Sequence, residues 1–470
     1  MQRMKGQIVE LDICELAFGG AGIGKHEGMA VFVEGAMPGD KVRASFRRIK
    51  SNFAEAELVE IIKPSKNRCR CRCQHADKCG GCQLQFMAYE KQLEFKKQQV
   101  IDAFERIGKI PDPPVKQIIG AEDQFYYRNK MEFSFGYDAE MNFALGLHVP
   151  GRRYDIMDIN ECMLQSEFST KIVNAVRELC IQKSWAPRKY STNEGFLKSL
   201  VIREGKRTGE VMVNLVTAGE VPENFAEELE ANVDAIRRAG GESEGGGVGK
   251  KIVSVYWSKI ISRRGIPKRI EETLIYGKKY FSERMILENG DEMQFDILPS
   301  AFFQVNTKQA EKLYSQVVDM AGEKSHETVF DLFCGTGTIG LFLAKHCGQV
   351  FGIEKEEAAV RAANENARNN KIFNIDFFTG DVNKALKSLK ERPGLVVIDP
   401  PRAGITEKII KQINDFGPSQ VIYVSCNPST LARDCAFFKE YGYNVKIVQP
   451  VDMFPHTYHI ENVCLLERQL

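Results

Sequence analysis

The segment VSCNPSTLARD, residues 424–434, carries the side chain best suited to nucleophilic chemistry. Its Cys426 follows an apolar run typical of a buried strand and precedes a predicted helix. A thiolate is a strong nucleophile, and a position near a helix start can lower the pKa of a thiol from its usual value of about 8.5. Most cysteines are instead small buried apolar residues. We expect that simpler role for Cys14, Cys180, Cys347, Cys435 and Cys464.

Three carboxylates follow successive predicted strands near a glycine turn. Glu354 ends QVFGIE, Asp381 follows NIDFFTG and Asp399 opens DPPRAG, while the turn DLFCGTGTIG spans 331–340. Ligands of open α/β sheets bind at the carboxyl ends of the strands. Glycines there let the backbone approach the ligand closely, and a helix start offers free N–H donors. The glycine spacing alone also fits a dinucleotide. The start D-x-F-C-G-T-G and the later DPP resemble class I S-adenosylmethionine methyltransferases instead, and we favour that cofactor.

A cysteine beside such a cofactor site fits methylation of C5 of uracil. C5 is a poor nucleophile, but a thiolate that adds to C6 creates an enolate with carbanion character at C5, which can accept a methyl group. A base must then remove the C5 proton so that the thiolate can leave. Glu461, just before the last predicted strand in HTYHIENVCLLE, fits that role, with His456 and His459 as alternatives.

The elements that must position these residues fall into three regions of the 470-residue chain. Residues 1–62 alternate apolar and polar around glycine turns, which predicts a small β-barrel. Residues 123–298 read mostly as strands with at least one helix, which predicts an α+β domain on an antiparallel sheet. From about residue 300, strands alternate with helices, which predicts a doubly wound, largely parallel sheet. A helix is also predicted within 89–109.

Five of the 13 cysteines lie between Cys69 and Cys82, in a chain with no apparent signal peptide and no run near the roughly 20 apolar residues of a membrane span. We therefore expect a cytoplasmic protein whose clustered thiols are ligands rather than disulfides. Four thiolates suit an iron–sulfur cluster or zinc, and their spacing alone does not decide between the two. The net charge of +1 provides no general attraction for nucleic acid. Local basic groups that favour RNA are Lys41, Arg43, Arg47, Arg48, Lys50, Arg128, Lys130, Arg152 and Arg153.

The motifs DLFCGTGT, DPPRAG, SCNPSTLARD and HIENVCLLE closely resemble the RNA uracil-5-methyltransferases, the RumA/TrmA family, over nearly the whole chain. The resemblance implies Cys426 as nucleophile and Glu461 as base. It implies S-adenosylmethionine contacts by Gln304, Phe333, Thr338, Glu354, Asp381 and Asp399. The family has asparagine where this chain has Thr338.

Two further resemblances concern the first half of the chain. GIGKHEGMAVFVEGAMPGD is similar to a TRAM domain, an OB-like RNA-binding barrel, and CQHADKCGGCQLQ is similar to the iron–sulfur segment of the rRNA-modifying branch. The latter implies a [4Fe–4S] cluster on Cys73, Cys79, Cys82 and Cys162, with Cys69 and Cys71 as competing ligands. We expect a TRAM domain at 1–66, a central iron–sulfur and RNA-binding α+β domain at 67–90 and 123–298, and a Rossmann-like methyltransferase domain at 91–122 and 299–470.

The expected substrate is a uridine of 23S rRNA, in an unstacked loop from which the base is flipped into the site. The bacterial tRNA branch lacks the barrel and the cysteine segment, whereas an archaeal tRNA branch has both, so tRNA stays an alternative. A second alternative is a non-catalytic RNA-binding assembly factor, against which Cys426 and Glu461 argue. A third alternative is an adenine or guanine methyltransferase, but that chemistry needs no thiolate and would give Cys426 no role. The expected state is a monomer.

Overall fold

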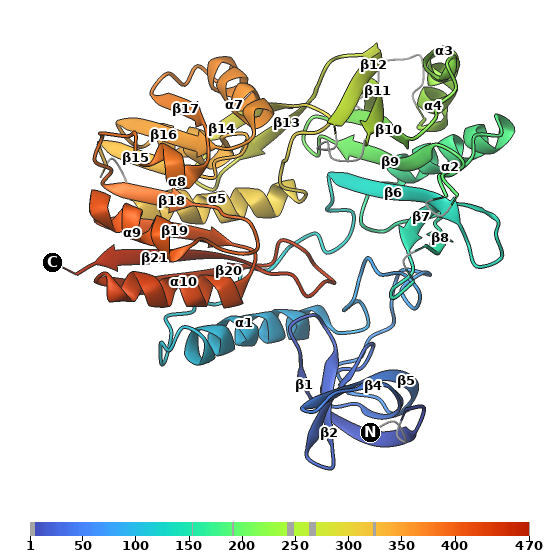
Figure 1. The fold of residues 1–470 in the computed structure, drawn as a ribbon, viewed down its shortest axis with the longest axis horizontal. Coiled ribbons are helices and arrows are strands. Elements are labelled where there is room, and N and C mark those ends of the chain that lie inside the picture. The colour runs from blue at the N-terminus through green and yellow to red at the C-terminus, as the bar shows by residue number, and fades with distance from the viewer. Residues whose placement is uncertain are drawn as a thin grey trace.

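The structure is a computed structural model that describes residues 5–152, 154–189, 192–241, 249–262, 269–322 and 326–469. It has a closed barrel at the N-terminus and two seven-stranded sheets, which lie side by side in Figure 1 with the barrel beyond one end. Within the described residues, no helix is long and apolar enough to cross a membrane. Arg153, one of the basic groups singled out for RNA, lies outside the described residues.

The barrel closes in the order β1-β2-β3-β5-β4. Its strands are β1 (Ile8–Leu16), β2 (Gly22–His26), β3 (Met29–Val33), β4 (Lys41–Ile49) and β5 (Phe53–Lys63). Alternation along β1 buries Val9, Leu11 and Ile13 in the barrel core and leaves the residues between them outside. The predicted barrel is therefore confirmed.

Four of the five predicted basic groups of the barrel have acidic partners on neighbouring strands, and the fifth, Lys50, lies 5.1 Å from the centre of the Phe53 ring. Lys41 lies 3.3 Å from Glu10, Arg43 lies 2.8 Å from Glu60, and Arg47 and Arg48 lie 3.5 and 3.9 Å from Glu55. The register of β4 with β1 and β5 creates these pairs, which the linear sequence did not reveal. The expected basic stripe is thus largely neutralised.

The central sheet has the order β12-β11-β10-β9-β6-β7-β8. Its strands are β6 (Lys130–Tyr137), β7 (Phe143–His148), β8 (Ile156–Asp158), β9 (Leu197–Glu204), β10 (Glu210–Ala218), β11 (Lys251–Ile261) and β12 (Arg269–Gly277), and its helices are α2 (Glu167–Gln182), α3 (Phe225–Ala231) and α4 (Val233–Ala239). The expected antiparallel arrangement is wrong for one pair, because β10 and β11 run parallel. A parallel pair needs a long crossover, and α3 and α4 lie within it.

The C-terminal sheet has the order β17-β16-β15-β18-β19-β21-β20. Its strands are β15 (Thr328–Leu332), β16 (Gln349–Glu354), β17 (Ile375–Thr379), β18 (Leu395–Ile398), β19 (Gln420–Ser425), β20 (Tyr443–Val451) and β21 (Glu461–Arg468). The associated helices are α5 (Thr307–Ala321), α6 (Thr338–Ala344), α7 (Glu357–Asn369), α8 (Val382–Ala385), α9 (Glu407–Phe416) and α10 (Pro428–Glu440). A hairpin of β13 (Phe281–Ile286) and β14 (Glu292–Ile297) precedes it.

The five strands β15 to β19 pair in parallel, and β21 runs antiparallel to both β19 and β20. The predicted doubly wound sheet is therefore confirmed. From β15 the chain adds β16 and β17 on one side and then returns to add β18 on the other. This reversal of strand order opens a crevice at the carboxyl ends of β15 and β18, where such folds bind ligands.

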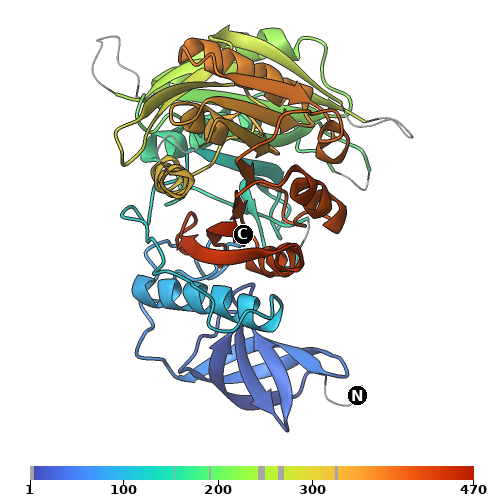
Figure 2. The ribbon, with the colours of Figure 1, turned by 90° about the vertical axis from the view of Figure 1, so that its left-hand side faces the viewer.

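Helix α1 (Tyr89–Arg106) lies between the barrel and the C-terminal sheet in both views (Figures 1 and 2). Its buried Val100, Ala103 and Phe104 share one hydrophobic cluster with Leu431 and Phe438 of α10. The helix thus joins the segment that follows the clustered cysteines to the sheet that carries Cys426 and Glu461.

Candidate active site

The glycine turn between β15 and α6 is tied to acids on two strands. Phe333, Gly335 and Gly337 have φ values of 63°, 54° and 78°, in the left-handed region. The Gly335 N–H donates to Glu354 Oε2 over 3.1 Å, and the Gly340 N–H donates to Asp331 Oδ2 over 2.9 Å. A Cβ on Gly337 would lie 2.5 Å from the Phe377 ring, so this close approach requires glycine.

The residues predicted to contact the cofactor gather around this turn. Glu354 ends β16, Asp399 directly follows β18, and Asp381 lies two residues beyond β17, so all three lie at the carboxyl edge of the sheet. Phe333 lies within the turn and Thr338 opens α6. Gln304 lies in the loop before α5, and Thr336 Oγ1 of the turn donates to Phe302 O of that loop over 3.4 Å.

Asp331 is a buried acid that was not predicted as a site residue from the sequence. It lies within β15, and burial with the nearby Asp399 raises its pKa to about 7. Burial likewise raises the pKa of Asp399 to about 7. The buried Tyr314 of α5 lies close to Asp399, Glu461 and Asp331. An acid inside an apolar strand directly before a glycine turn was the signal that could have identified Asp331.

Cys426 and Glu461 meet at the same edge of the sheet. In the antiparallel pair β19–β21, Ser425 is opposite Asn462, and the Asn462 side-chain N–H donates to Ser425 O over 3.4 Å. One step further along both strands, Cys426 and Glu461 therefore lie opposite each other. The structure brings together the two residues that the sequence placed 35 positions apart.

Arg402 is a third group at this place and was not predicted as a site residue. Its side chain hydrogen bonds to Cys426, and its positive charge lies close to Glu461. The start of α10 holds its loop, since Asn427 Nδ2 and Thr430 Oγ1 both donate to Arg402 O, over 3.2 and 3.3 Å. The position of Arg402 in DPPRAG, three residues after Asp399, was the available signal.

A helix start can lower the pKa of a thiol, but other groups determine the pKa of Cys426 here. Burial and the neighbouring Glu461 raise it to about 11, although Arg402 acts in the opposite direction. The side chain of Asn427 caps α10 by accepting from the Ser429 N–H over 3.0 Å, which uses one of the free donors that would stabilise a thiolate. Complete burial and the nearby Asp399 also raise the pKa of Glu461 well above its usual range.

The two histidines named as alternative bases have other surroundings. His456 is buried, and its Nδ1 lies 3.2 Å from Gln92 Nε2 of α1. The His459 ring packs against Tyr458 and Phe454, with centroids 4.2 and 5.9 Å apart. Burial lowers the pKa of both histidines to about 4.

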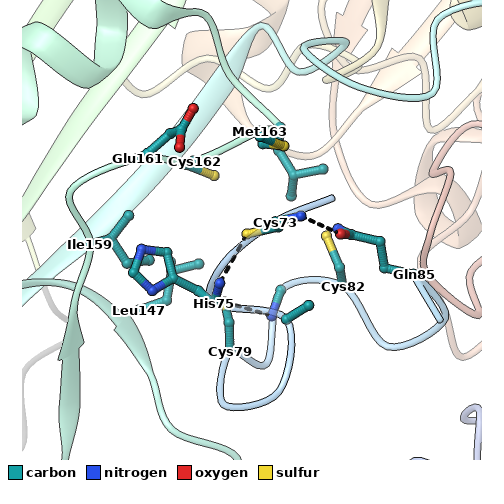
Figure 3. A pocket seen from close by; sticks show the side chains of 13 residues that line it. Cys73, His75, Cys79, Cys82, Gln85, Leu147, Ile159, Glu161, Cys162 and Met163 are labelled. Atoms are coloured by element: carbon teal, nitrogen blue, oxygen red, sulfur yellow. Dashed lines mark hydrogen bonds between the residues drawn. The ribbon is translucent and has the colours of Figure 1, made fainter. Parts of the chain in front are cut away.

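A second candidate site lies at the clustered cysteines. Cys73, Cys79, Cys82 and Cys162 all line one pocket of about 370 Å³, whereas Cys69 and Cys71 do not line it (Figure 3). The N–H groups of His75 and Gly81 donate to the sulfurs of Cys73 and Cys79 over 3.4 and 3.3 Å. Burial raises the pKa of Cys79 to about 11 and that of Cys82 to about 12.

Arg128 and Lys130, two of the predicted RNA contacts, line an open hollow of about 670 Å³ that also borders the cysteine pocket through Gly81 and Leu147. The Arg128 guanidinium lies 5.8 Å from the centre of the Phe454 ring, in the loop before Glu461. Arg152 lies 3.5 Å from Asp155 on the surface.

Known proteins resemble this chain over almost its whole length. Residues 258–469 match the tRNA (uracil-5-)-methyltransferase family, and residues 2–59 match the TRAM domain. An uncharacterised RNA methyltransferase of Caldanaerobacter subterraneus subsp. tengcongensis is 39% identical over 99% of both chains. One from Clostridium tetani is 36% identical over 100% of this chain and 99% of its own length.

The chain belongs to the tRNA (uracil-5-)-methyltransferase family. It is an RNA methyltransferase with an N-terminal TRAM domain. Among solved structures, the tRNA (uracil-54, C5)-methyltransferase of Pyrococcus abyssi in complex with S-adenosyl-L-homocysteine is 28% identical, with a TM-score of 0.74, and covers 97% of this chain and 100% of its own. That similarity extends to the central sheet, which neither family match covers completely.

The family match does not show what the cysteine pocket binds, so we compare its geometry with that of a site for a single metal ion. Across the described ranges, no group of three or more His, Cys, Asp or Glu side chains is placed to hold a single metal ion. Tetrahedral zinc, with bonds of about 2.3 Å to sulfur, needs sulfurs about 3.8 Å apart. The four thiols instead line the wall of one pocket.

Proposed function

We propose that this chain transfers a methyl group from S-adenosylmethionine to C5 of an RNA uridine, with Cys426 as nucleophile and Glu461 as base. The observation that carries the proposal is the pairing of Cys426 with Glu461 across β19 and β21, beside Asp399 and the glycine turn. A thiol and a carboxyl group at one sheet edge are the two groups that methylation of C5 requires as nucleophile and base.

The proposed reaction has three steps. The Cys426 thiolate adds to C6, and the electrons of the C5–C6 double bond move towards C5 and the neighbouring carbonyl. C5 then bonds to the methyl group, and the electrons of the broken S–CH₃ bond stay on the cofactor sulfur. Finally the Glu461 carboxylate takes the C5 proton, the double bond re-forms and the thiolate leaves. Arg402, which hydrogen bonds to Cys426, stabilises its anionic form before addition and after release.

The cofactor supplies the methyl group as a positively charged sulfonium. Gln304, Phe333, Thr338, Glu354, Asp381 and Asp399 would surround it, since they border the glycine turn or the sheet edge. Asp331, Asp399, Cys426 and Glu461 all have raised pKa values here. A nearby cation favours the ionised forms of all four, so cofactor binding promotes both the thiolate and the carboxylate.

We also propose that Cys73, Cys79, Cys82 and Cys162 hold a [4Fe–4S] cluster. Four thiols, of which Cys162 is buried and the other three are partly buried, line one pocket, and N–H groups of His75 and Gly81 point at two of the sulfurs. Buried thiolates need compensating positive charge and such N–H donors, and an iron–sulfur cluster uses both. The cluster would fix the segment 73–82 against the loop of Cys162.

The proposed substrate is a uridine of 23S rRNA. The barrel together with the cysteine segment supports it, because the bacterial tRNA-modifying branch resembles only the catalytic part. The second candidate is tRNA, favoured by the similarity to the tRNA (uracil-54, C5)-methyltransferase of Pyrococcus abyssi. The basic hollow at Arg128 and Lys130, close to the Glu461 loop, is the proposed RNA contact for either substrate.

The deciding experiment is to map 5-methyluridine in 23S rRNA and tRNA from cells with and without this protein. The deletion strain should lose the modification at defined 23S rRNA positions, and the intact gene should restore it, whereas a Cys426→Ala gene should not. Loss of 5-methyluridine from tRNA alone would show that tRNA, the second candidate, is the substrate. Loss from neither RNA would contradict the proposed function.

A further inference from the structure

Gln92 of α1 is completely buried and connects two distant segments by hydrogen bonds. Its Nε2 donates to Leu84 O and Met87 O over 3.0 and 2.8 Å, just beyond the clustered cysteines. Its Oε1 accepts from the His456 N–H over 3.0 Å. One side chain thus joins the cysteine segment to the loop 452–460, which ends where Glu461 begins β21.

The two segments also contact each other directly. The Leu84 N–H donates to His456 O over 2.9 Å, and Leu84 lies two residues after Cys82. Gln85, the next residue after Leu84, accepts at its Oε1 from the Cys73 N–H over 2.8 Å. The main chain around two proposed cluster ligands therefore leads to His456 through a short series of hydrogen bonds.

His456 is held in an unusual conformation at this junction. Its φ is 65°, in the left-handed region that disfavours a branched or bulky side chain. Its ring packs against Phe125 with centroids 4.5 Å apart. Burial lowers the pKa of this ring to about 4, and its Nδ1 lies 3.2 Å from Gln92 Nε2.

The start of the same loop is fixed by a buried ion pair. Lys96 Nζ lies 2.6 Å from Asp452 Oδ1, and both side chains are almost fully shielded from solvent. Lys96 also donates to Phe454 O over 3.2 Å, and Tyr89 OH donates to Asp452 Oδ2 over 2.8 Å. Helix α1 therefore fixes the loop at its start through Lys96 and at its middle through Gln92.

We propose that Gln92 is a positioning residue for removal of the C5 proton, and that through it the state of the cysteine pocket controls the placement of Glu461. This inference rests on the proposed roles of Glu461 and the cluster. A general base must lie within hydrogen-bond reach of the proton it removes, and a displacement of about 1 Å can cost about 100-fold in rate. Removing Gln92 leaves the cofactor crevice intact but frees the loop that leads to Glu461.

The test compares Gln92→Leu with Gln98→Leu. Gln98 is an exposed glutamine on the same helix, and its side chain donates to Asp102 within that helix. The full-length proteins are mixed with S-adenosylmethionine and a substrate RNA identified by the mapping above, and the covalent protein–RNA adduct is followed over time. Gln92→Leu should lengthen the lifetime of the adduct at least about tenfold, as expected for partial loss of a general base. Its affinity for S-adenosylhomocysteine should stay within about twofold, and Gln98→Leu should match wild type.

Two more variants keep the test decisive if Gln92→Leu folds poorly. His456→Asn tolerates the left-handed φ but removes the ring that packs between Phe125 and the Gln92 side chain, and Cys82→Ser disrupts the cysteine pocket. Both should lengthen the adduct lifetime in the same direction. A wild-type lifetime in Gln92→Leu and His456→Asn, or a loss of cofactor binding in parallel with adduct formation, would overturn the role of Gln92. If the adduct lifetime is normal in Cys82→Ser but long in Gln92→Leu, the cysteine pocket does not control the placement of Glu461.

Glu461→Gln separates this inference from the proposed function. If it traps the adduct while Gln92→Leu behaves normally, only the positioning role is wrong. If Glu461→Gln itself traps no adduct, the proposed base is wrong.

Discussion

Cys426 and Glu461 lie opposite each other at the end of the antiparallel pair β19–β21, one step beyond the pairing of Ser425 with Asn462. Glu461 is close enough to Cys426 to be the second-largest cause of the raised pKa of its thiol, after burial. Without the cofactor, and in spite of Arg402, the site thus favours the neutral thiol and the neutral acid. Addition to C6 and removal of the C5 proton both require the ionised forms, so Arg402 and the sulfonium become central to the account.

Arg402→Met tests the role of that cation. It should lower kcat for methylation by about 100-fold, because it removes a preorganised positive charge from the Cys426 thiolate. Affinity for S-adenosylhomocysteine should change little. Arg402→Lys should recover part of the rate, and Arg392→Met, an exposed arginine before β18, should match wild type. Single-turnover rates check this, and an unchanged kcat in Arg402→Met would remove Arg402 from the mechanism.

The acids around the crevice predict a pH effect on cofactor binding. Asp331 and Asp399 have pKa values of about 7, above the usual range, so they are mostly neutral at pH 6 and mostly ionised at pH 8. Ionised acids attract the sulfonium, so affinity for S-adenosylmethionine should rise about tenfold from pH 6 to pH 8. Affinity for S-adenosylhomocysteine, which lacks that charge, should rise less.

Isothermal titration calorimetry at a series of pH values measures this difference. Asp399→Asn should flatten the dependence for S-adenosylmethionine, since an amide does not ionise. Equal pH dependence for the two ligands in the wild-type protein would contradict the proposed link between these acids and the sulfonium.

The cysteine pocket predicts different results for neighbouring thiols. Anaerobically purified protein should be brown and contain iron and acid-labile sulfide, and Cys82→Ser should lose both. Cys69→Ser should keep them, because Cys69 is exposed and does not line the pocket. Metal analysis and the visible absorption spectrum measure the outcome. A colourless protein with one bound zinc, or an equal loss in both variants, would refute the proposed ligand set.

Much of the fold and site could be predicted because local patterns determine it. Alternation predicted the barrel, and acids after successive apolar runs had to meet at one sheet edge once the strands were parallel. The β10–β11 pairing depends on how distant segments meet, which periodicity does not specify. The ion pairs of Arg43 and Arg47 likewise depend on strand register, and the raised pKa of Cys426 depends on burial. Arg402 was missed because its role comes from the cap of α10, which holds its loop.

The central claim is that Cys426 forms a covalent bond to the uridine. The most direct measurement uses substrate RNA with 5-fluorouridine at the target position, where fluorine replaces the proton that Glu461 would remove and so prevents release. After incubation with S-adenosylmethionine, mass spectrometry of digested protein should find the methylated nucleotide on the peptide that contains Cys426, and Cys426→Ala should form no adduct while it still binds S-adenosylhomocysteine. An adduct on another residue, or near-normal methylation by Cys426→Ala, would contradict the account.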